Sequence, residues 1–298
     1  MRRLIVNADD FGLTSGVNRG IIEAHERGIV TSSTLMASGP SFDEAISLAA
    51  QTPSLSVGCH VLLVDACPIL DSQQISTLVR GNSGLPRFRE HAMSFACLAT
   101  MRKLNEDQIE AEITAQIRKL QSAGIQVSHL DSHKHTHMFP VVFRSMLRAA
   151  KKCGILAVRN PFEPFIFAST SQGNWKRSFQ LGILRSFRSS FRRALRDTGI
   201  VTPDGCIGIV ATGGLNLDIF RELIENLPEG TWEFVSHPGY NDADLSKIKT
   251  RLRGSRQKEL AVLTSDEARE LLARKQIELI SYRDFPLLCK AFPQGVAP

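Results

Sequence analysis

The sequence predicts an α/β fold, an irregular (β/α) barrel of the TIM type that forms a single domain over residues 1–298. Strand-like and helix-like segments alternate from the first residues almost to the last, which is typical of a parallel sheet covered by helices. Polar residues follow several of the strands, and barrels of parallel strands build their sites at that end. No glycine-rich turn of the dinucleotide-binding type follows the first strand, which argues against that class of fold.

The expected strands are short runs rich in apolar and β-branched residues. They lie at residues 3–8, 29–37, 55–64, 127–133, 157–159, 208–212, 232–236 and 277–281. The expected helices have apolar residues at helical spacing. They lie at residues 15–27, 41–51, 106–123, 140–153, 217–226, 244–261 and 265–275. Residues 65–105 are punctuated by Pro and Gly, which predicts a long loop that serves as a lid.

The composition is that of an ordinary globular protein, with 43% hydrophobic and 22% charged residues. No apolar run approaches the length of a membrane span. The first apolar run is too short for a signal peptide and is closed by Asp9 and Asp10. The six cysteines are scattered without a CxxC pair, which fits a reducing compartment. We therefore expect a cytoplasmic protein.

Histidines are concentrated in one short segment, because four of the eight fall within the nine residues 129–137. Polar residues recur there at a spacing of two: His129, Asp131, His133, His135 and His137. An extended strand would place all of them on one face. Imidazole and carboxylate are ligands that zinc and similar divalent ions prefer, and such clustering favours a metal site. The alternatives are a solvated polar strand or a set of hydrogen-bonded core histidines.

Further polar groups follow other predicted strands. Asp9 and Asp10 come directly after the first strand, and adjacent carboxylates repel one another unless a cation lies nearby. The alternative is a turn in which an Asp caps the next helix. His60 lies near the end of the third strand and would supply a ligand from a separate part of the sheet; the alternative is a purely structural role, which is usual for a single His at such a position. His237 precedes a Pro-Gly turn that would present its ring at the barrel mouth, unless the ring merely caps that turn.

Four segments together resemble the YdjC-like carbohydrate deacetylases: residues 7–12 (NADDFG), 58–60 (GCH), 129–140 (HLDSHKHTHMFP) and 237–239 (HPG). The resemblance implies an irregular (β/α) barrel and metal-dependent removal of an acetyl group from N-acetylglucosamine units. Within the family the chain is most similar to the hopanoid-biosynthesis-associated branch, which implies a glycosylated hopanoid lipid as substrate. Residues 165–205 do not match the members that deacetylate chitooligosaccharides.

The resemblance also implies a ligand set, in which Asp10, His60 and His133 bind one divalent metal ion, Mg²⁺ or Zn²⁺. An ion held there would polarise the acetyl oxygen and lower the pKa of a water molecule. The same segment supplies residues that would orient the ligand rings and fix their tautomers. These supporting residues are His129, Asp131, His135 and His137.

Three further residues match catalytic positions of the family. Asp9 matches the general base, which would remove the water proton. His237 matches the general acid, because an imidazole that titrates near neutrality can protonate the departing amine. Arg159 matches a residue that orients the base.

The net charge of +6 is confined to one segment. Residues 176–196 contain seven Lys or Arg and no acid, whereas the rest of the chain carries 29 basic and 30 acidic residues. On a helix over 179–196, aromatic and aliphatic residues fall on one side and arginines on the other. This pattern predicts a basic amphipathic insertion within residues 165–205 that docks on an anionic membrane. The alternative is a barrel helix with a solvated basic side.

The sequence therefore favours a metal-dependent N-deacetylase of an N-acetylglucosamine glycoside. The alternatives are a metal-dependent phosphoesterase, since the same ligands can polarise phosphate, and a non-catalytic protein that binds sugars or a membrane surface. The expected partner is an N-acetylated sugar or glycolipid, with peripheral contact at the inner face of the membrane. No nucleic-acid motif is present, and a homodimer is left open beside a monomer.

Overall fold

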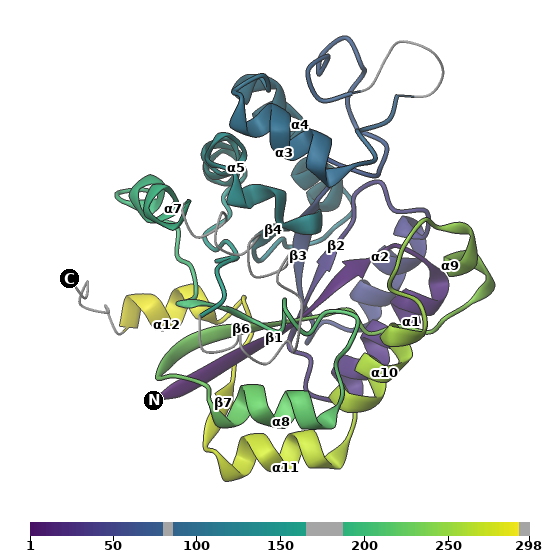
Figure 1. Ribbon diagram of the computed structural model, residues 1–298, viewed down its shortest axis with the longest axis vertical. Helices are drawn as coiled ribbons and strands as arrows, with labels where there is room; N and C mark the ends of the chain where they lie inside the picture. The colour runs from purple at the N-terminus through teal and green to yellow at the C-terminus, as the bar shows by residue number, and fades with distance from the viewer. Residues whose placement is uncertain (80–85, 165–186, 292–298) are drawn as a thin grey trace.

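The computed structural model describes residues 1–79, 86–164 and 187–291 and is built around a parallel seven-stranded sheet (Figure 1). The strand order is β4-β3-β2-β1-β6-β5, and β7 pairs with the first residues of β1. The strands are β1 (Arg2–Phe11), β2 (Ser32–Leu35), β3 (Ser56–Val61), β4 (Leu130–Ser132), β5 (Gly205–Ile207), β6 (Gly230–Ser236) and β7 (Ile277–Leu279). Strand β1 lies at the centre and is buried from Leu4 to Phe11.

The sheet curls, and residues 157–162 connect its two edges. Val158 bridges to Leu130 in β4, and the backbone N–H of Cys206 in β5 donates to the carbonyl of Phe162 at 3.4 Å. The strands are parallel throughout, so their carboxyl ends share one rim. The predicted single-domain α/β fold of irregular barrel type is confirmed.

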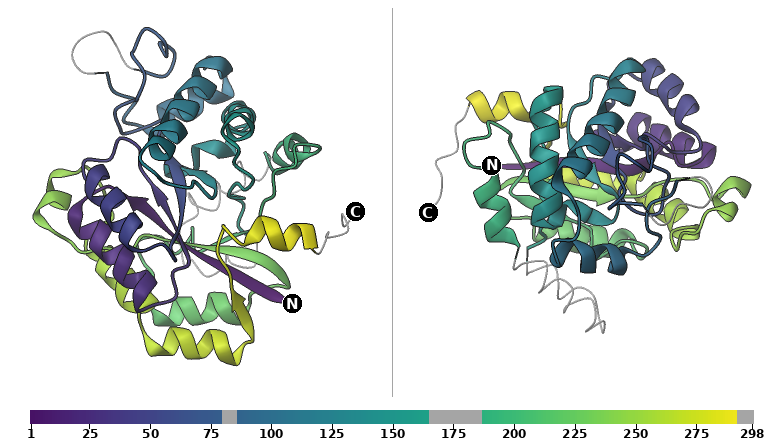
Figure 2. Two further views of the ribbon diagram at one scale, coloured as in Figure 1. Left: turned by 180° about the vertical axis from the view of Figure 1, so that it is seen from behind. Right: turned by 90° about the horizontal axis from the view of Figure 1, so that it is seen from above.

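Helices cover the outside of the sheet (Figure 2). Polar side chains cap the starts of several of these helices; for example, Thr14 accepts from the N–H of Val17, and Asn105 accepts from two N–H groups. They are α1 (Ser15–Glu26), α2 (Phe42–Gln51), α3 (Ala92–Thr100), α4 (Glu106–Ser122), α5 (Pro140–Cys153), α7 (Arg188–Leu195), α8 (Leu217–Glu225), α9 (Ala243–Lys247), α10 (Gly254–Leu263), α11 (Asp266–Arg274) and α12 (Phe285–Ala291).

The segment that contains the histidine cluster differs from its prediction. The expected strand over 127–133 is reduced to β4, and the chain continues as a 3₁₀ helix, η1 (His133–Met138). The Ser132 hydroxyl accepts from the N–H of His137 and shares a second hydrogen bond with that ring, which turns the chain back. Lys134 and His135 take left-handed backbone angles, with φ of 52° and 53°. The expectation that the five polar side chains form one extended stripe was wrong.

Four other expectations are corrected. Residues 65–105 are not irregular throughout, because α3 packs Phe95 and Ala99 inward one turn apart. The strand expected at 208–212 is a turn that follows β5. The helix expected over 244–261 is divided into α9 and α10, since Arg253 donates to carbonyls at Ser246 and Ile248 and folds the chain back. Helix α12 was not expected.

Two predicted features fall partly outside the described residues. Of the basic insertion at 165–205, the structure describes 187–205, in which α7 packs Phe191 inward against Phe143 and Phe162. Of the lid at 65–105, it describes all but residues 80–85. Among the described residues, no helix combines the length and the hydropathy that a membrane span requires.

We expect Gly58→Ala to destabilise the fold by about 1–3 kcal/mol, the usual cost of overpacking a core. A Cβ at Gly58 in β3 would lie 2.4 Å from Nδ1 of His129, whose ring is fixed by stacking on Tyr282 at 3.7 Å. Urea unfolding measures the loss. Gly254→Ala is the matched control, because a Cβ at Gly254 meets no atom within 4 Å. Equal stability of the two variants would contradict the packing argument.

Candidate metal centre

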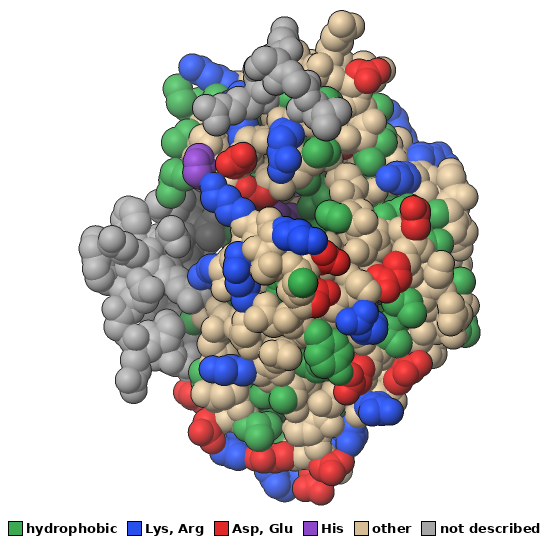
Figure 3. All heavy atoms as spheres, turned by 90° about the vertical axis from the view of Figure 1, so that its right-hand side faces the viewer, with side chains coloured by type: hydrophobic (Ala, Val, Ile, Leu, Met, Phe, Trp, Pro, Cys, Tyr) green, Lys and Arg blue, Asp and Glu red, His purple; other side chains and the backbone are tan. Residues whose placement is uncertain are grey.

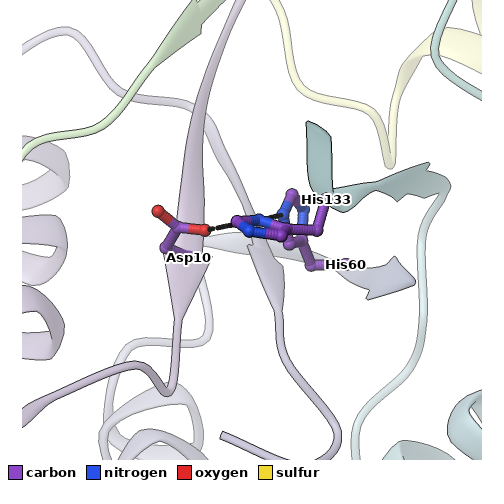
Figure 4. A group of neighbouring side chains, drawn as sticks. All are labelled: Asp10, His60 and His133. Carbon is purple, nitrogen blue, oxygen red and sulfur yellow. Dashed lines mark hydrogen bonds and ion pairs between the residues drawn. The ribbon is translucent and has the colours of Figure 1, made fainter. Parts of the chain in front are cut away.

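Three potential ligand atoms from three separate elements converge at the carboxyl rim of the sheet (Figure 4). Asp10 Oδ1 lies 3.5 Å from His60 Nε2 and 3.5 Å from His133 Nδ1, and the two ring nitrogens are 3.3 Å apart. Asp10 comes from β1, His60 from β3 and His133 from the residue after β4. The structure therefore brings together the three residues predicted as metal ligands.

A local irregularity in β1 brings both adjacent aspartates to this site. In a regular strand Asp9 and Asp10 would point to opposite faces. The pairing of β1 with β2 shifts register between Ala8 and Phe11, and Asp10 has a left-handed φ of 70°. Such a bulge re-aims the side chains that follow it. Asp9 consequently lies with His60 and Asp131 in a second close group on the same side.

The donor set fits one divalent cation. Asp10 Oδ1 is buried and has no hydrogen-bond partner, while Oδ2 accepts from Arg256. His60 donates from Nδ1 to Asp131 Oδ1 at 2.8 Å, so its Nε2 is presented to the other two ligands. In a tetrahedral site with ligands at 2.0–2.1 Å, neighbouring ligand atoms are about 3.3–3.4 Å apart. The three observed separations are close to that spacing.

Arg159 lies at the centre of a buried charge network beside these ligands. Its guanidinium contacts Asp9 through two nitrogens at 2.9 and 2.6 Å. It also contacts Asp131 and Glu233, each at 2.7 Å. Arg159 and all three carboxylates are almost fully buried. Because an unpaired buried charge is costly, this network constrains the positions of all four side chains.

The charges set the protonation of the aspartates. Burial opposes the ionisation of Asp9, but the Arg159 guanidinium more than offsets it and holds the pKa of Asp9 well below its ordinary value. Burial likewise opposes the ionisation of Asp10, and there Arg256 and then His133 hold the pKa low. Both carboxylates are therefore ionised at neutral pH.

His60 shows the opposite balance. Burial lowers its pKa, but Asp131, together with Asp9 and Asp10, outweighs burial and raises the pKa to about 9. In the metal-free protein the ring is therefore an imidazolium at neutral pH. A cation can bind at Nε2 only when the proton there has left.

His237 lies next to Asp9, which belongs to the close group with His60 and Asp131. Its Nε2 is 3.8 Å from Asp9 Oδ2, and its backbone N–H donates to Glu259 at 2.6 Å. The side chains of His237 and His133 are 13% and 25% exposed, whereas those of Asp9, Asp10 and His60 are almost fully buried. The solvent-accessible side of this group of residues is therefore formed by His133 and His237.

The other members of the histidine cluster do not join the three ligands. His129 stacks on Tyr282, and burial followed by the charge of Arg159 lowers its pKa. Burial and Arg159 also lower the pKa of His135 to about 3. His137 is held by Ser132 and is buried. Of the predicted supporting residues, Asp131 has a direct contact with a ligand, His60.

Several residues at the site were not predicted. Arg256 and Glu259 in α10, Glu233 in β6 and Tyr282 are all buried and contact the residues described above. Glu233 could have been predicted from the sequence. It is a charged residue inside the run Trp-Glu-Phe-Val of an otherwise apolar strand, and such a charge needs a buried partner. Arg256 and Glu259 could not have been singled out in the same way, because they lie in a segment rich in charged residues.

Comparison with known proteins identifies the family of this chain. Residues 3–274 match the family model described as YdjC-like protein. This chain belongs to the YdjC-like family. Carbohydrate deacetylases of Geobacillus stearothermophilus and Brevibacillus brevis are 33% and 30% identical to it, over 95% of this chain and 98% and 99% of theirs. A crystal structure from Enterococcus faecalis V583, provisionally named a cellobiose-phosphate cleavage protein, has a TM-score of 0.77 at 27% identity. The match covers 95% of this chain and 98% of the Enterococcus faecalis chain.

We expect divalent metal binding to tighten as the pH rises towards about 9, because below that pH His60 carries a proton that must leave. Near neutral pH, about one proton should be released for each metal ion bound. Titration calorimetry in two buffers of different ionisation enthalpy measures this release. His60→Gln should bind metal more weakly and lose most of the pH dependence. An affinity of the wild type that does not change between the ordinary histidine pKa of about 6.5 and the raised pKa of about 9 would contradict the assignment.

Proposed function

We propose that this protein catalyses the metal-dependent hydrolytic removal of an N-acetyl group from an N-acetylglucosamine-containing glycoside. The observation that carries the proposal is the convergence of Asp10, His60 and His133, with Asp9 and His237 beside them. Relatives that match over nearly their whole length are carbohydrate deacetylases, which supports a hydrolase that acts on an acetylated sugar. The linear amide C–N bond is the expected point of cleavage.

Asp10, His60 and His133 would hold one divalent cation, Zn²⁺ or Mg²⁺. When bound, the cation supplies a Lewis acid that polarises the acetyl carbonyl and makes water more acidic. The separations of the ligand atoms favour a small tetrahedral ion such as Zn²⁺.

Asp9 is proposed as the base that accepts the proton of the attacking water. Arg159 keeps this carboxylate ionised and fixes its plane through two hydrogen bonds. The same contacts make Asp9 a weak base, so it depends on an acidified water. Arg159 is accordingly a positioning residue for Asp9.

His237 is proposed as the acid that protonates the departing nitrogen. The water oxygen bonds to the acetyl carbon, the C–N bond breaks, and its electron pair takes the proton that His237 supplies. The products are acetate and the free amine. His237 suits this step because it lies near Asp9 on the more exposed side of the site, from which the substrate approaches.

The phosphoesterase alternative is less well supported. Phosphoesterases often use two metals held by several carboxylates. Here Asp9, Asp131 and Glu233 are paired with Arg159, whose positive charge already balances the carboxylates that a second cation would use. The deacetylase needs one cation and is compatible with this arrangement.

The lipid substrate and the membrane contact remain predictions. A glycosylated hopanoid would be reached from an anionic surface, and the exposed Arg192, Arg193 and Arg196 in and after α7 supply positive charge. On the face shown in Figure 3, which contains α9 and α10, acidic and basic side chains are interspersed. We therefore propose that a cytoplasmic protein docks through the side that carries α7.

We expect Asp9→Asn and His237→Ala each to lower kcat for acetate release by about 10²–10⁴-fold, the usual contribution of a general base or acid. Acetate is measured on N-acetylglucosamine glycosides after metal stripping and add-back. Arg148→Gln, at an ion pair on α5 away from the rim, is the control and should retain full activity. No acetate release by the wild type with any of several metals and sugars would exclude the deacetylase.

We expect the protein to co-sediment with vesicles of anionic lipids at low salt and to be released at high salt. Substituting Arg192, Arg193 and Arg196 together by Ser should weaken binding by about 1 kcal/mol per arginine removed, a loss of roughly 100-fold in total. The control is the triple variant in which Arg118, Arg221 and Arg269 are replaced by Ser. It removes the same charge from other helices. If both triple variants bind alike, or if neutral vesicles bind equally well, α7 has only a structural role.

A further inference from the structure

Helix α10 places a second buried arginine directly against a proposed metal ligand. Arg256 is 1% exposed and donates from Nη2 to Asp10 Oδ2. Its Nε donates to the backbone carbonyl of Leu252 at 3.2 Å, which fixes the guanidinium in place. The two carboxylate oxygens of Asp10 therefore have different neighbours: Oδ2 accepts from Arg256, and Oδ1 points towards His60 and His133.

The charge of Arg256 is balanced differently from that of Arg159. Three carboxylates surround Arg159, whereas Asp10 is the one ion-pair partner of Arg256 among the described residues. Glu259, one turn further along α10, accepts instead from the N–H groups of His237 and Gly213. The positive charge of Arg256 is therefore balanced by the same carboxylate that must bind a cation.

We propose that Arg256 is a positioning residue that tunes the metal site. It restricts Asp10 to a single ligand oxygen and lowers the affinity of the site for a divalent cation. A cation that receives less charge from its ligands remains a stronger Lewis acid, and a carboxylate that gives one oxygen leaves more coordination positions for water and substrate. The inference rests on the metal site of the proposed function and adds a residue to it.

Electrostatics and positioning predict opposite effects when the charge of Arg256 is removed. If Arg256 acted only by holding Asp10 in place, its loss would let the ligand move and metal binding would weaken. If its charge matters most, removal abolishes a repulsion between two cations in a buried site, where such interactions are strong. It also frees the second oxygen of Asp10. Metal binding then tightens while catalysis is impaired.

The test compares metal affinity with kinetics in Arg256→Gln, Arg256→Met and Arg256→Lys. We expect the two neutral variants to bind Zn²⁺ at least about tenfold more tightly than the wild type in calorimetry or chelator competition. Their kcat for acetate release should fall by about tenfold or more, with a smaller change in KM. Arg256→Lys keeps the charge and should bind metal within about threefold of the wild type.

Controls separate this inference from damage to the fold. Arg283→Gln removes the same charge from an exposed arginine that contacts the carbonyls of Pro53 and Leu55, and it should leave metal affinity unchanged. Two neutral variants are used so that failure of one to fold leaves the other. Unchanged or weaker metal binding in a folded neutral variant, with an active wild type, overturns this inference alone. Absence of metal binding by the wild type overturns the proposed function and this inference with it.

Discussion

The burial of Arg159 among three carboxylates is the interaction on which the site depends. Asp9, Asp131 and Glu233 come from β1, β4 and β6, so a single guanidinium joins three strands at the rim. Each charge would be expensive to bury alone, and each is stabilised by the others. Arg159 belongs to residues 157–162, which also connect the edges of the sheet. Closure of the barrel and assembly of the site are therefore consequences of the same segment.

The Arg159 network affects both the proposed base, Asp9, and the proposed metal ligand His60. Through Asp9, it keeps the proposed base ionised and holds its plane. Through Asp131, it sets the tautomer of His60, because Asp131 accepts from Nδ1 and directs Nε2 towards Asp10 and His133. Tyr282 donates to Glu233 and stacks on His129, so the network extends into the apolar core. A substitution at any of these residues should therefore alter the geometry of the proposed metal ligands.

The site is built at two departures from regular structure. Asp10 reaches its place through a register shift and a left-handed backbone conformation in β1. His133 reaches its place where β4 ends and η1 begins, next to two left-handed residues. Left-handed conformations are costly for residues other than glycine and tend to occur where function requires them. The histidine cluster has a spacing of two in the sequence, but an extended strand is therefore not what directs His133 towards Asp10 and His60.

From the sequence alone one can obtain the family and the alternation of strands and helices, because these depend on local patterns. The family resemblance assigns the three proposed metal ligands. His60 and Asp10 could be named since carboxylates and imidazoles that follow apolar strands have limited alternatives. Their buried partners could be named only in part: the family resemblance gave Arg159 as the residue that orients Asp9, whereas Arg256 was not predicted. Arg256 is separated from Asp10 by 246 positions, and Arg159 from Asp9 by 150, and no periodicity links residues so far apart. Their pairing is decided by how the closed sheet and its outer helices pack, since a buried charge is tolerated only where folding brings an opposite charge to meet it.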